Sequence, residues 1–405
     1  RYVPTPSPLS RRSMLTASAL VSSAVIAGCA PSPDSLNGRS ADKEAQTPTP
    51  TPTPASLNLS AEHPLTEVEP GDSLTFTVTN GSVDKITVTN ADKEDVEGTF
   101  TDGVWKPKHP FRPSRSYEVH TTLANADPSL PAPKPLVTSI STVKGEGNAG
   151  NILYEDMDDA GIGMPVIILF NHDVVDKDKR AAIEKAMTIE VSPEQEGSWG
   201  WLDGTHLMWR PKQYWKPGTK VSVKGDFGGL KTASNRWLLN NLTGKFGIGK
   251  SRVVKISTSD HRLDVFIDGK KARSMPCTTG KSGFITRSGT KVIIEREADK
   301  VMDASTIGIS PGSSEYYNLE VKWALRITYT GEFIHAAPWS SRSQGRANVS
   351  HGCVGLATDD AKWLFKTCRA GDIVETTGSN RHFKPEEGIG CWVYDWAGWQ
   401  KLSAV

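Results

Sequence analysis

Residues 350–355 read "SHGCVG" and place Cys353 directly after a His-Gly pair. A free thiol has a pKa of about 8.5 and is mostly protonated at neutral pH, so a nucleophilic cysteine needs a base beside it. His335 and His351 supply two imidazole rings in this part of the sequence. An imidazole that takes the thiol proton gives a thiolate–imidazolium pair, which attacks acyl carbons. These residue types predict acyl transfer through a thioester on Cys353.

Two structural uses of the same residues stay open at this stage. Apart from Cys29, the cysteines form an even set that allows three pairings into two disulfides: Cys277, Cys353, Cys368 and Cys391. A zinc site is the other alternative, although its candidate ligands match no usual zinc spacing: His335, His351, Cys353 and Cys368. Gly352 and Gly355 favour the nucleophile, because glycines around a cysteine let a ligand approach the backbone closely.

The elements that must position these residues begin near Ser251. Asp268-Gly269 lies between two alternating apolar runs and predicts a type I′ hairpin. "TKVIIERE", "LRITYTG" and "EFIHAAP" predict further strands. "TDDAKWLFKTCRAGD" predicts a helix capped by Thr358, whose apolar positions at i, i+3, i+4 and i+7 end at Cys368. Cys368 is therefore expected in the core.

Two β-domains are predicted before this unit. "DSLTFTVTNG", "DKITVTNADKEDVEGTF" and "SYEVHTTLAN" predict a small sandwich over about residues 57–147. "VKGEGNAG", residues 143–150, is interpreted as a linker. "MPVIILFN" and "MTIEVSPE" fall in a second β-domain over about 152–248, with one short helix around Asp178–Met187. The Trp-rich tail "GCWVYDWAGWQKL" is expected to pack back on the last domain.

The first residues predict an export signal. Arg11-Arg12 precedes an uncharged stretch from Ser13 to Gly28, which is too short for a secure transmembrane helix. "SRRSML" resembles a twin-arginine motif, with a plain Sec signal as the alternative. "VIAGC" resembles a lipobox that would acylate Cys29, with an ordinary cleavage site as the alternative. The sequence thus predicts an exported protein, lipid-anchored to the outer face of the cell membrane.

Composition restricts the class of partner. The net charge is +1 with no block of basic residues, which argues against nucleic acid as the main partner. Thr-Pro repeats near residue 50 cannot bury a core and predict an extended spacer.

A specific resemblance starts in "IHAAPWSSRSQGRANVSHGCVGLATDDAKWL". This segment resembles the active-site signature of the L,D-transpeptidase (YkuD) family, in which a His precedes Ser-His-Gly-Cys by about fifteen residues. "GSWGWLDGTHLMWRPKQYWKPGTKVSV", "EYYNLEVKWALRITYTGEFIHAAPWS" and "RAGDIVE" extend the likeness to actinobacterial members with two immunoglobulin-like domains. The resemblance covers most of residues 152–400 and is weaker over 57–147.

The resemblance implies a chemistry and a set of roles. Cys353 is expected to attack a peptidoglycan tetrapeptide stem and expel D-Ala, with His335 as the base, and a second stem's amine then gives a 3→3 cross-link. His351 is expected to line the site, and the backbone N–H groups of His351, Gly352 and Cys353 are the expected oxyanion donors. No metal or organic cofactor is expected, and carbapenem β-lactams are expected inhibitors. Six further residues are expected to bind substrate: Tyr317, Thr330, Gly331, Gly355, Met302 and Trp339.

Two positions depart from the family's pattern. Gly355 stands where the family usually has Asn or Arg, which removes a side-chain hydrogen bond near the substrate. Ala336 stands where close relatives have Ser. Two other functions therefore stay open, namely an L,D-carboxypeptidase that hydrolyses the same bond and a catalytically impaired wall-binding scaffold lipoprotein.

The predicted fold is mainly β, with two immunoglobulin-like β-sandwich domains, a YkuD-type β-sandwich catalytic domain with a short helix, and a Trp-rich C-terminal extension. The predicted division is as follows: residues 1–29 signal peptide with lipobox, 30–56 Thr/Pro-rich linker, 57–147 first immunoglobulin-like domain, 148–250 second immunoglobulin-like domain, 251–378 catalytic domain, and 379–405 C-terminal extension.

Overall fold

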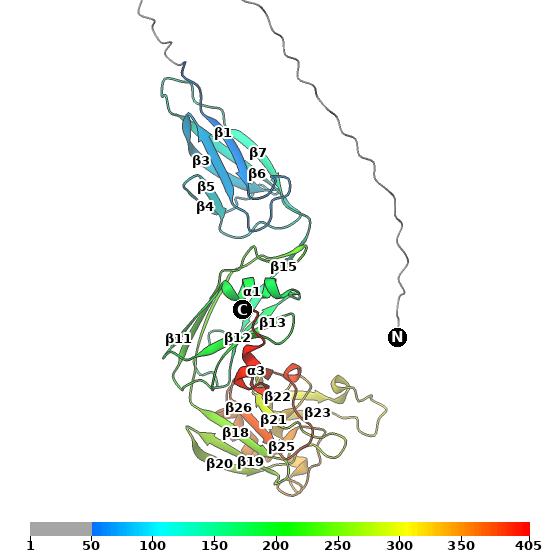
Figure 1. Cartoon of the computed structure of the whole chain (residues 1–405). Coiled ribbons are helices and arrows are strands. Elements are labelled where there is room, and N and C mark those ends of the chain that lie inside the picture. The colour runs from blue at the N-terminus through cyan, green and yellow to red at the C-terminus, as the bar shows by residue number, and fades with distance from the viewer. Residues whose placement is uncertain (1–50) are drawn as a thin grey trace, which may run out of the picture. The chain divides into compact units, whose positions relative to one another are not determined.

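The computed structural model describes residues 51–405 (Figure 1). The predictions on the signal peptide, on the lipidation of Cys29 and on most of the Thr/Pro-rich linker lie outside the described residues. The mainly β prediction is confirmed, because strands β1 to β26 dominate the described part and α-helices are few and short. Within residues 51–405, no helix is long and apolar enough to cross a bilayer.

The first domain is a sandwich of two antiparallel sheets. One sheet has four strands in the order β1 (Ser56–Ala61), β2 (Leu74–Thr79), β5 (Val104–Pro107), β4 (Gly98–Thr101). The other has three in the order β3 (Gly81–Asn90), β6 (Ser116–Asn125), β7 (Leu136–Ser141). Alternation along β2 turns Leu74 and Phe76 inward, where they join Trp105 in one core.

The second domain is built on three smaller sheets. The first sheet has the order β12 (Gly197–Trp201), β13 (His206–Pro211), β10 (Val166–Phe170), β9 (Gly150–Leu153). The second has the order β11 (Met187–Ser192), β14 (Lys220–Gly225), β17 (Leu242–Gly247), and the third β15 (Lys231–Ala233), β16 (Arg236–Leu238), β8 (Glu146–Asn148). The predicted helix is α1 (Lys177–Lys185). Because β8 pairs with β16, the interpretation of residues 143–150 as a plain linker is wrong.

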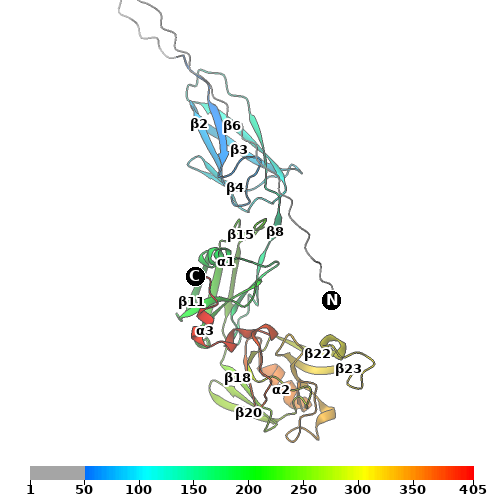
Figure 2. The ribbon, with the colours of Figure 1, turned by 45° about the vertical axis from the view of Figure 1, so that its right-hand side comes forward.

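The last domain packs two sheets against one helix. The larger sheet has the order β20 (Lys270–Pro276), β19 (Arg262–Ile267), β18 (Arg252–Ser257), β26 (Ile373–Thr377), β21 (Gly289–Val292). The smaller sheet has the order β22 (Glu295–Asp303), β23 (Asn318–Arg326), β24 (Phe333–Ala336), β25 (Val354–Leu356). Helix α2 (Thr358–Thr367) packs on β23 and β24 (Figure 2). The apolar core lies between these elements and includes Cys368, as expected.

Local signals in this domain were mostly predictive. The turn between β19 and β20 has positive φ at Asp268 and Gly269, as a type I′ turn requires. The capping prediction is wrong, because the N-cap of α2 is Ala357 and Thr358 is already its first residue. The acidic residues of its first turn still favour this end of the helix.

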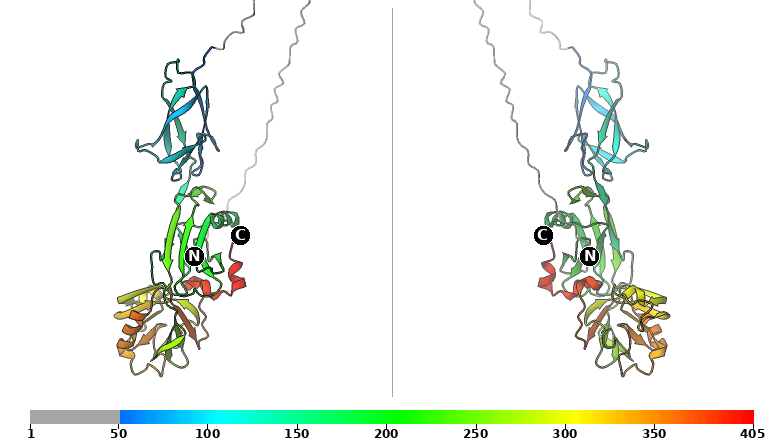
Figure 3. Two further views of the ribbon diagram at one scale, coloured as in Figure 1. Left: turned by 90° about the vertical axis from the view of Figure 1, so that its left-hand side faces the viewer. Right: turned by 90° about the vertical axis from the view of Figure 1, so that its right-hand side faces the viewer.

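The C-terminal extension contacts the second domain, not only the domain that precedes it (Figures 1 and 3). It contains the 3-10 helices η3 (Pro385–Glu387) and η4 (Gly390–Val393) and helix α3 (Trp396–Gln400). Arg210 on β13 is buried beneath Trp392, Trp396 and Trp399, with its guanidinium carbon 4.6, 5.4 and 5.2 Å from their ring centroids. The aromatic rings thus cover a buried cation, which explains why the tail packs across both domains.

Candidate active site

A cleft with a volume of about 350 Å³ opens in the last domain beside β24 and β25. Seven of the ten predicted catalytic and substrate-binding residues line it: Cys353, His335, His351, Tyr317, Gly355, Met302 and Trp339. Thr330, Gly331 and Gly352 do not line it. Apolar side chains such as Leu319 and Val321 share the wall with the hydroxyl-bearing residues Ser340, Ser343 and Ser350. The sequence motif and its distant partners therefore meet in one cleft.

Strand pairing brings the cysteine to its histidine. β24 and β25 are parallel neighbours, and His335 pairs with Gly355, two residues beyond Cys353. The Cys353 thiol donates to the Gly331 carbonyl oxygen, with 3.6 Å between sulfur and oxygen. Cys353 is free, as are the other three cysteines of residues 51–405, so the disulfide alternative is wrong. Its sulfur is available for chemistry.

The zinc alternative is not supported by the geometry. Cys368 lies fully buried in the core at the end of α2, whereas Cys353, His335 and His351 line the cleft. In the part of the chain that the structure describes, no group of three or more His, Cys, Asp or Glu side chains gathers as metal ligands.

Burial disfavours the charged form of both partners of the pair. Burial raises the pKa of the Cys353 thiol to about 12, and a hydrogen bond from the Phe333 backbone only partly opposes this shift. Burial also lowers the pKa of His335 below its usual range. A dry environment disfavours both charged forms. Burial therefore works against the expected thiolate–imidazolium pair.

The tautomer of His335 is fixed by the backbone. Its Nδ1 lies 2.8 Å from the carbonyl oxygen of Ala336, which can only accept, so Nδ1 carries the proton. Nε2 then holds the lone pair that can take a proton from a thiol. Because this orienting partner is a main-chain carbonyl, the Ala336 side chain is not needed for it. Trp339 is 61% exposed, and its ring centroid lies 6.0 Å from that of His335.

The turn before the nucleophile has its own hydrogen bonds. The Ser350 hydroxyl donates to the Cys353 carbonyl oxygen at 2.6 Å and accepts from the Gly352 N–H at 3.1 Å. Gly352 has a φ of 124°, a conformation that favours glycine. The Gly352 N–H thus already donates to Ser350. Of the three predicted oxyanion donors, the N–H groups of His351 and Cys353 therefore remain.

Gly355 is enclosed by neighbouring atoms. A Cβ there would lie 2.9 Å from both Ala337 Cβ and Thr278 Cγ2. Its N–H and carbonyl also form two hydrogen bonds with the Thr278 backbone, at 2.9 and 3.0 Å. The packing around position 355 therefore leaves little room for the larger side chain that the family usually has there. Gly355 contributes only backbone to the cleft.

Thr330 and Gly331 sit in the turn before β24. The Thr330 hydroxyl donates to that of Thr328 at 3.2 Å. Gly331 has a φ of 95°, and a Cβ there would come within 2.7 Å of Ile307 Cγ2. Gly331 therefore touches the thiol through its carbonyl and packs under the loop that follows β22.

Buried charges lie beneath this turn, and no pattern along the sequence indicates them. The Glu332 carboxylate accepts from Lys291 Nζ and from Arg287 Nη1, both at 2.9 Å, and Arg287 also donates to Glu387. Lys291 is fully buried, and this burial lowers its pKa. A Cβ on Gly352 would lie 3.7 Å from Glu332 Cγ. This network fixes the backbone on which the nucleophile rests.

A second network holds His351 at the mouth of the cleft. Its Nε2 lies 2.6 Å from Glu315 Oε2, which also accepts from Lys281 Nζ at 2.6 Å. Its ring lies between Phe284 and Tyr317, with centroids 4.5 and 5.1 Å away. Sequence reasoning missed Glu315, Lys281 and Phe284 because they come from loops that no local pattern brings together.

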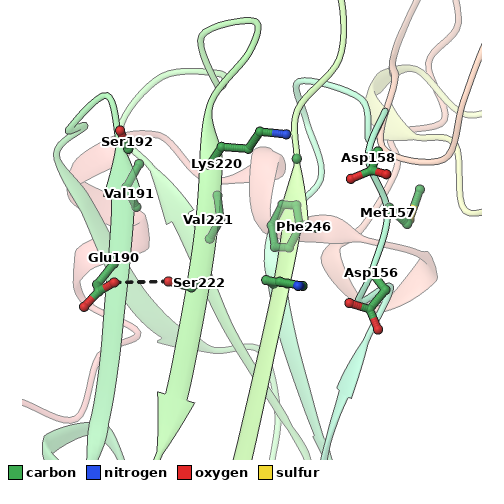
Figure 4. Close-up of a pocket in the computed structure, with 12 residues that line it drawn as sticks. Asp156, Met157, Asp158, Glu190, Val191, Ser192, Lys220, Val221, Ser222 and Phe246 are labelled. Carbon is green, nitrogen blue, oxygen red and sulfur yellow. Dashed lines mark hydrogen bonds between the residues drawn. The ribbon is translucent and has the colours of Figure 1, made fainter.

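A larger cavity, of about 630 Å³, lies on the second domain against β11, β14 and β17 (Figure 4). Figure 4 shows Glu190, Ser222 and Lys220 among its lining residues, with the Ser222 hydroxyl donating to Glu190 at 3.3 Å. No cysteine or histidine lines it. The chemistry, and not the size, therefore places the candidate active site in the smaller cleft.

Comparison with known protein families gives one match in the immunoglobulin-like region and one in the last domain. A model described as bacterial Ig domain matches residues 65–231, and a model described as L,D-transpeptidase catalytic domain matches 251–376. Three relatives come from Mycobacterium tuberculosis. L,D-transpeptidase 2 is 34% identical over 62% of this chain and 62% of its own length, and L,D-transpeptidase 5 is 36% identical over 66% and 58%. L,D-transpeptidase 1 is 35% identical over 54% of this chain and 80% of its own.

The chain spans about three fifths of the length of the first two of these relatives. Among solved structures, the LD transpeptidase LdtMt1 in complex with imipenem gives a TM-score of 0.49 at 33% identity, covering 56% of this chain and 97% of that one. An L,D-transpeptidase from Mycobacterium smegmatis gives a TM-score of 0.46 at 29% identity, covering 56% of this chain and 99% of that one.

Proposed function

The chain belongs to the L,D-transpeptidase family, and from this premise we propose that it forms 3→3 cross-links between peptidoglycan stems through a thioester on Cys353. The observation that carries the proposal is that a free thiol and an imidazole with a defined basic nitrogen line the same open cleft. No metal or organic cofactor takes part in the proposed steps.

The first half-reaction is acylation. Cys353 Sγ attacks the carbonyl of the third residue of a tetrapeptide stem while His335 Nε2 takes the thiol proton. The N–H groups of His351 and Cys353 hydrogen-bond the oxyanion, and each such donor contributes about 3–4 kcal/mol in related acyl transfers. The His335 imidazolium then protonates the departing D-Ala amine. Because burial disfavours both charged forms, the proton transfer in this proposal accompanies the attack on the substrate carbonyl.

The second half-reaction transfers the acyl group. A side-chain amine of another stem attacks the thioester carbon, and His335 accepts a proton from it and returns a proton to the leaving sulfur. Met302, Tyr317 and Trp339 provide apolar surface for the stems. Thr330 and Gly331 are proposed to contact the stem at the strand edge. Gly355 is proposed to contact it through its backbone only.

We further propose that carbapenems acylate Cys353. The same nucleophile that opens a peptide carbonyl opens a strained β-lactam carbonyl, and the relative LdtMt1 was solved in complex with imipenem.

The proposed location is the outer face of the cell membrane, facing the wall. The Arg11-Arg12 signal and the lipobox at Cys29 support export by the Tat or Sec route and a lipid anchor. The two immunoglobulin-like domains would then separate the catalytic domain from the lipid surface.

Cys353→Ala tests the function directly. We expect dimer formation from purified disaccharide-tetrapeptide to be lost in this variant, whereas the control Cys277→Ala, which removes a buried thiol outside the cleft wall, keeps it. Products are separated by chromatography and identified by mass. Unchanged dimer yield in Cys353→Ala would refute the proposal. Release of tripeptide without dimer by the wild type would favour the carboxypeptidase function. Absence of both product and covalent adduct would favour the scaffold function.

A further inference from the structure

Cross-linking needs two proton acceptors, and the proposed mechanism has named only one. A stem's side-chain amine has an ordinary pKa of about 10.4, so at neutral pH it arrives as an ammonium ion without a lone pair. It must lose one proton before it attacks the thioester and a second one after the C–N bond begins to form. His335 handles the second proton. The first proton passes either to solvent or to another base in the cleft.

The cleft holds a second imidazole with the opposite tautomer. His335 has its proton on Nδ1, whereas His351 directs Nε2 at the Glu315 carboxylate, which can only accept. In the neutral ring, Nδ1 of His351 is therefore the basic atom. It has no hydrogen-bond partner within residues 51–405.

The surroundings of His351 also differ from those of His335. The His335 side chain is nearly fully buried, whereas 21% of the His351 side chain is exposed. Glu315 supports His351 as a carboxylate supports the imidazole of a hydrolytic triad, because it stabilises the charge formed when the other ring nitrogen takes a proton. Lys281 in turn lowers the pKa of Glu315 and keeps it ionised.

We propose, on the basis of the proposed cross-linking function, that His351 removes the first proton from the acceptor ammonium and that Glu315 is the residue that positions it for this step. The acceptor is the side-chain amine of the proposed function. It is a primary amine on a flexible side chain that enters at the mouth of the cleft, where His351 and Tyr317 lie.

The step balances. One proton passes from the ammonium to Nδ1 of His351, and the free amine attacks the thioester carbon. As the C–N bond forms and the C–S bond breaks, the second proton passes to Nε2 of His335 and on to the Cys353 sulfur. His351 then releases its proton to solvent. The net reaction is thioester plus ammonium to amide plus thiol plus one proton.

The charged or titratable groups that contact His351 or its partner are Glu315, Tyr317 and Lys281. Cys353 and His335 line the same cleft. Desolvation raises the pKa of Tyr317 to about 12, so this phenol stays neutral. Glu315 is thus the only carboxylate that hydrogen-bonds the ring within the described residues.

Glu315→Gln in the full-length chain tests the inference. The ratio of dimer formation to acyl-enzyme formation is measured from pH 6.5 to 9.5, with tetrapeptide as donor and acceptor and with intact-mass detection of the acyl-enzyme. We expect this ratio to fall at least tenfold below wild type near pH 7. The deficit should shrink to about twofold at pH 9.5, because there roughly a tenth of the amine is already free. Glu315→Asp should restore most of the ratio.

The control is Glu320→Gln, an exposed carboxylate on β23 outside the cleft wall, which should match the wild type throughout. An unchanged ratio in Glu315→Gln, or a deficit of equal size at every pH, would overturn the inference, since the second result indicates a purely structural role. Failure of the wild type to form any acyl-enzyme would instead overturn the proposed function.

Discussion

The regions around Cys353 and Cys368 both bury a free thiol in the same domain, and only one of them is suited to chemistry. Burial raises the pKa of both thiols, to about 12 for Cys353 and further for Cys368. Cys368 is fully buried in the core at the end of α2 and does not line the cleft that holds Cys353. Cys353 shares a cleft with His335. Access to a cleft and to an imidazole, and not the direction of the pKa shift, therefore distinguishes Cys353 from Cys368.

The largest expected effect is on the rate of Cys353 acylation when its proposed base, His335, is removed. His335→Gln removes the proton acceptor that the mechanism assigns to the thiol, and loss of general base catalysis costs about 10²–10⁴ in rate. We expect acylation of Cys353, followed by intact-mass spectrometry, to slow by this factor. A His261→Gln variant, which changes an imidazole outside the cleft, is the control. Equal acylation rates in the two variants would remove His335 from the mechanism.

A smaller effect is expected in the pH dependence of Cys353 alkylation. It distinguishes a neutral Cys353–His335 pair from a preformed thiolate–imidazolium pair. Because the pKa of the Cys353 thiol is raised to about 12, its thiolate fraction should rise about tenfold per pH unit up to pH 10. Alkylation of Cys353 by iodoacetamide, followed by peptide mapping, should rise in parallel, whereas Cys368 should stay unmodified in the folded protein. A rate that levels off near pH 7 would indicate a preformed thiolate.

The smallest expected effect concerns stability near Cys368. Burial raises the pKa of Asp372 to about 7, although Arg252 and Arg369 lie nearby. The folded state thus keeps a proton that the unfolded chain has lost, so the free energy of unfolding should fall as pH rises from about 4 to about 7. Asp372→Asn should relieve this penalty above pH 7, by at most about 4 kcal/mol, and have little effect at pH 4.

Thermal unfolding of Asp372→Asn at pH 4 and pH 8 measures this difference. The exposed Asp84→Asn in the first domain is the control. Equal shifts in melting temperature at both pH values would contradict a raised Asp372 pKa.

Local patterns in the sequence predicted much of this architecture. The Asp268-Gly269 turn, the core position of Cys368 and the mainly β class follow from nearest-neighbour signals. The cleft residues His335 and Cys353 were predicted through the resemblance to a family signature. Its spacing reflects two neighbouring strands, because His335 lies on β24 and Cys353 directly precedes β25.

Long-range contacts could not be predicted in the same way. Glu315 and Lys281 meet His351 from separate loops, and no pattern along the chain records that meeting. The tail's contact with Arg210 depends on an aromatic cluster closing over a cation that lies far away in the sequence. The directions of the two pKa shifts in the cleft also needed the structure, because they depend on burial.

The most direct test of the account is to locate the covalent adduct. The full-length chain is incubated with tetrapeptide donor or with imipenem, digested and mapped by tandem mass spectrometry. The account predicts one adduct, a thioester on Cys353, that is absent when Cys353 is replaced by alanine. An adduct on another residue, or wild-type turnover without any adduct on Cys353, would contradict it.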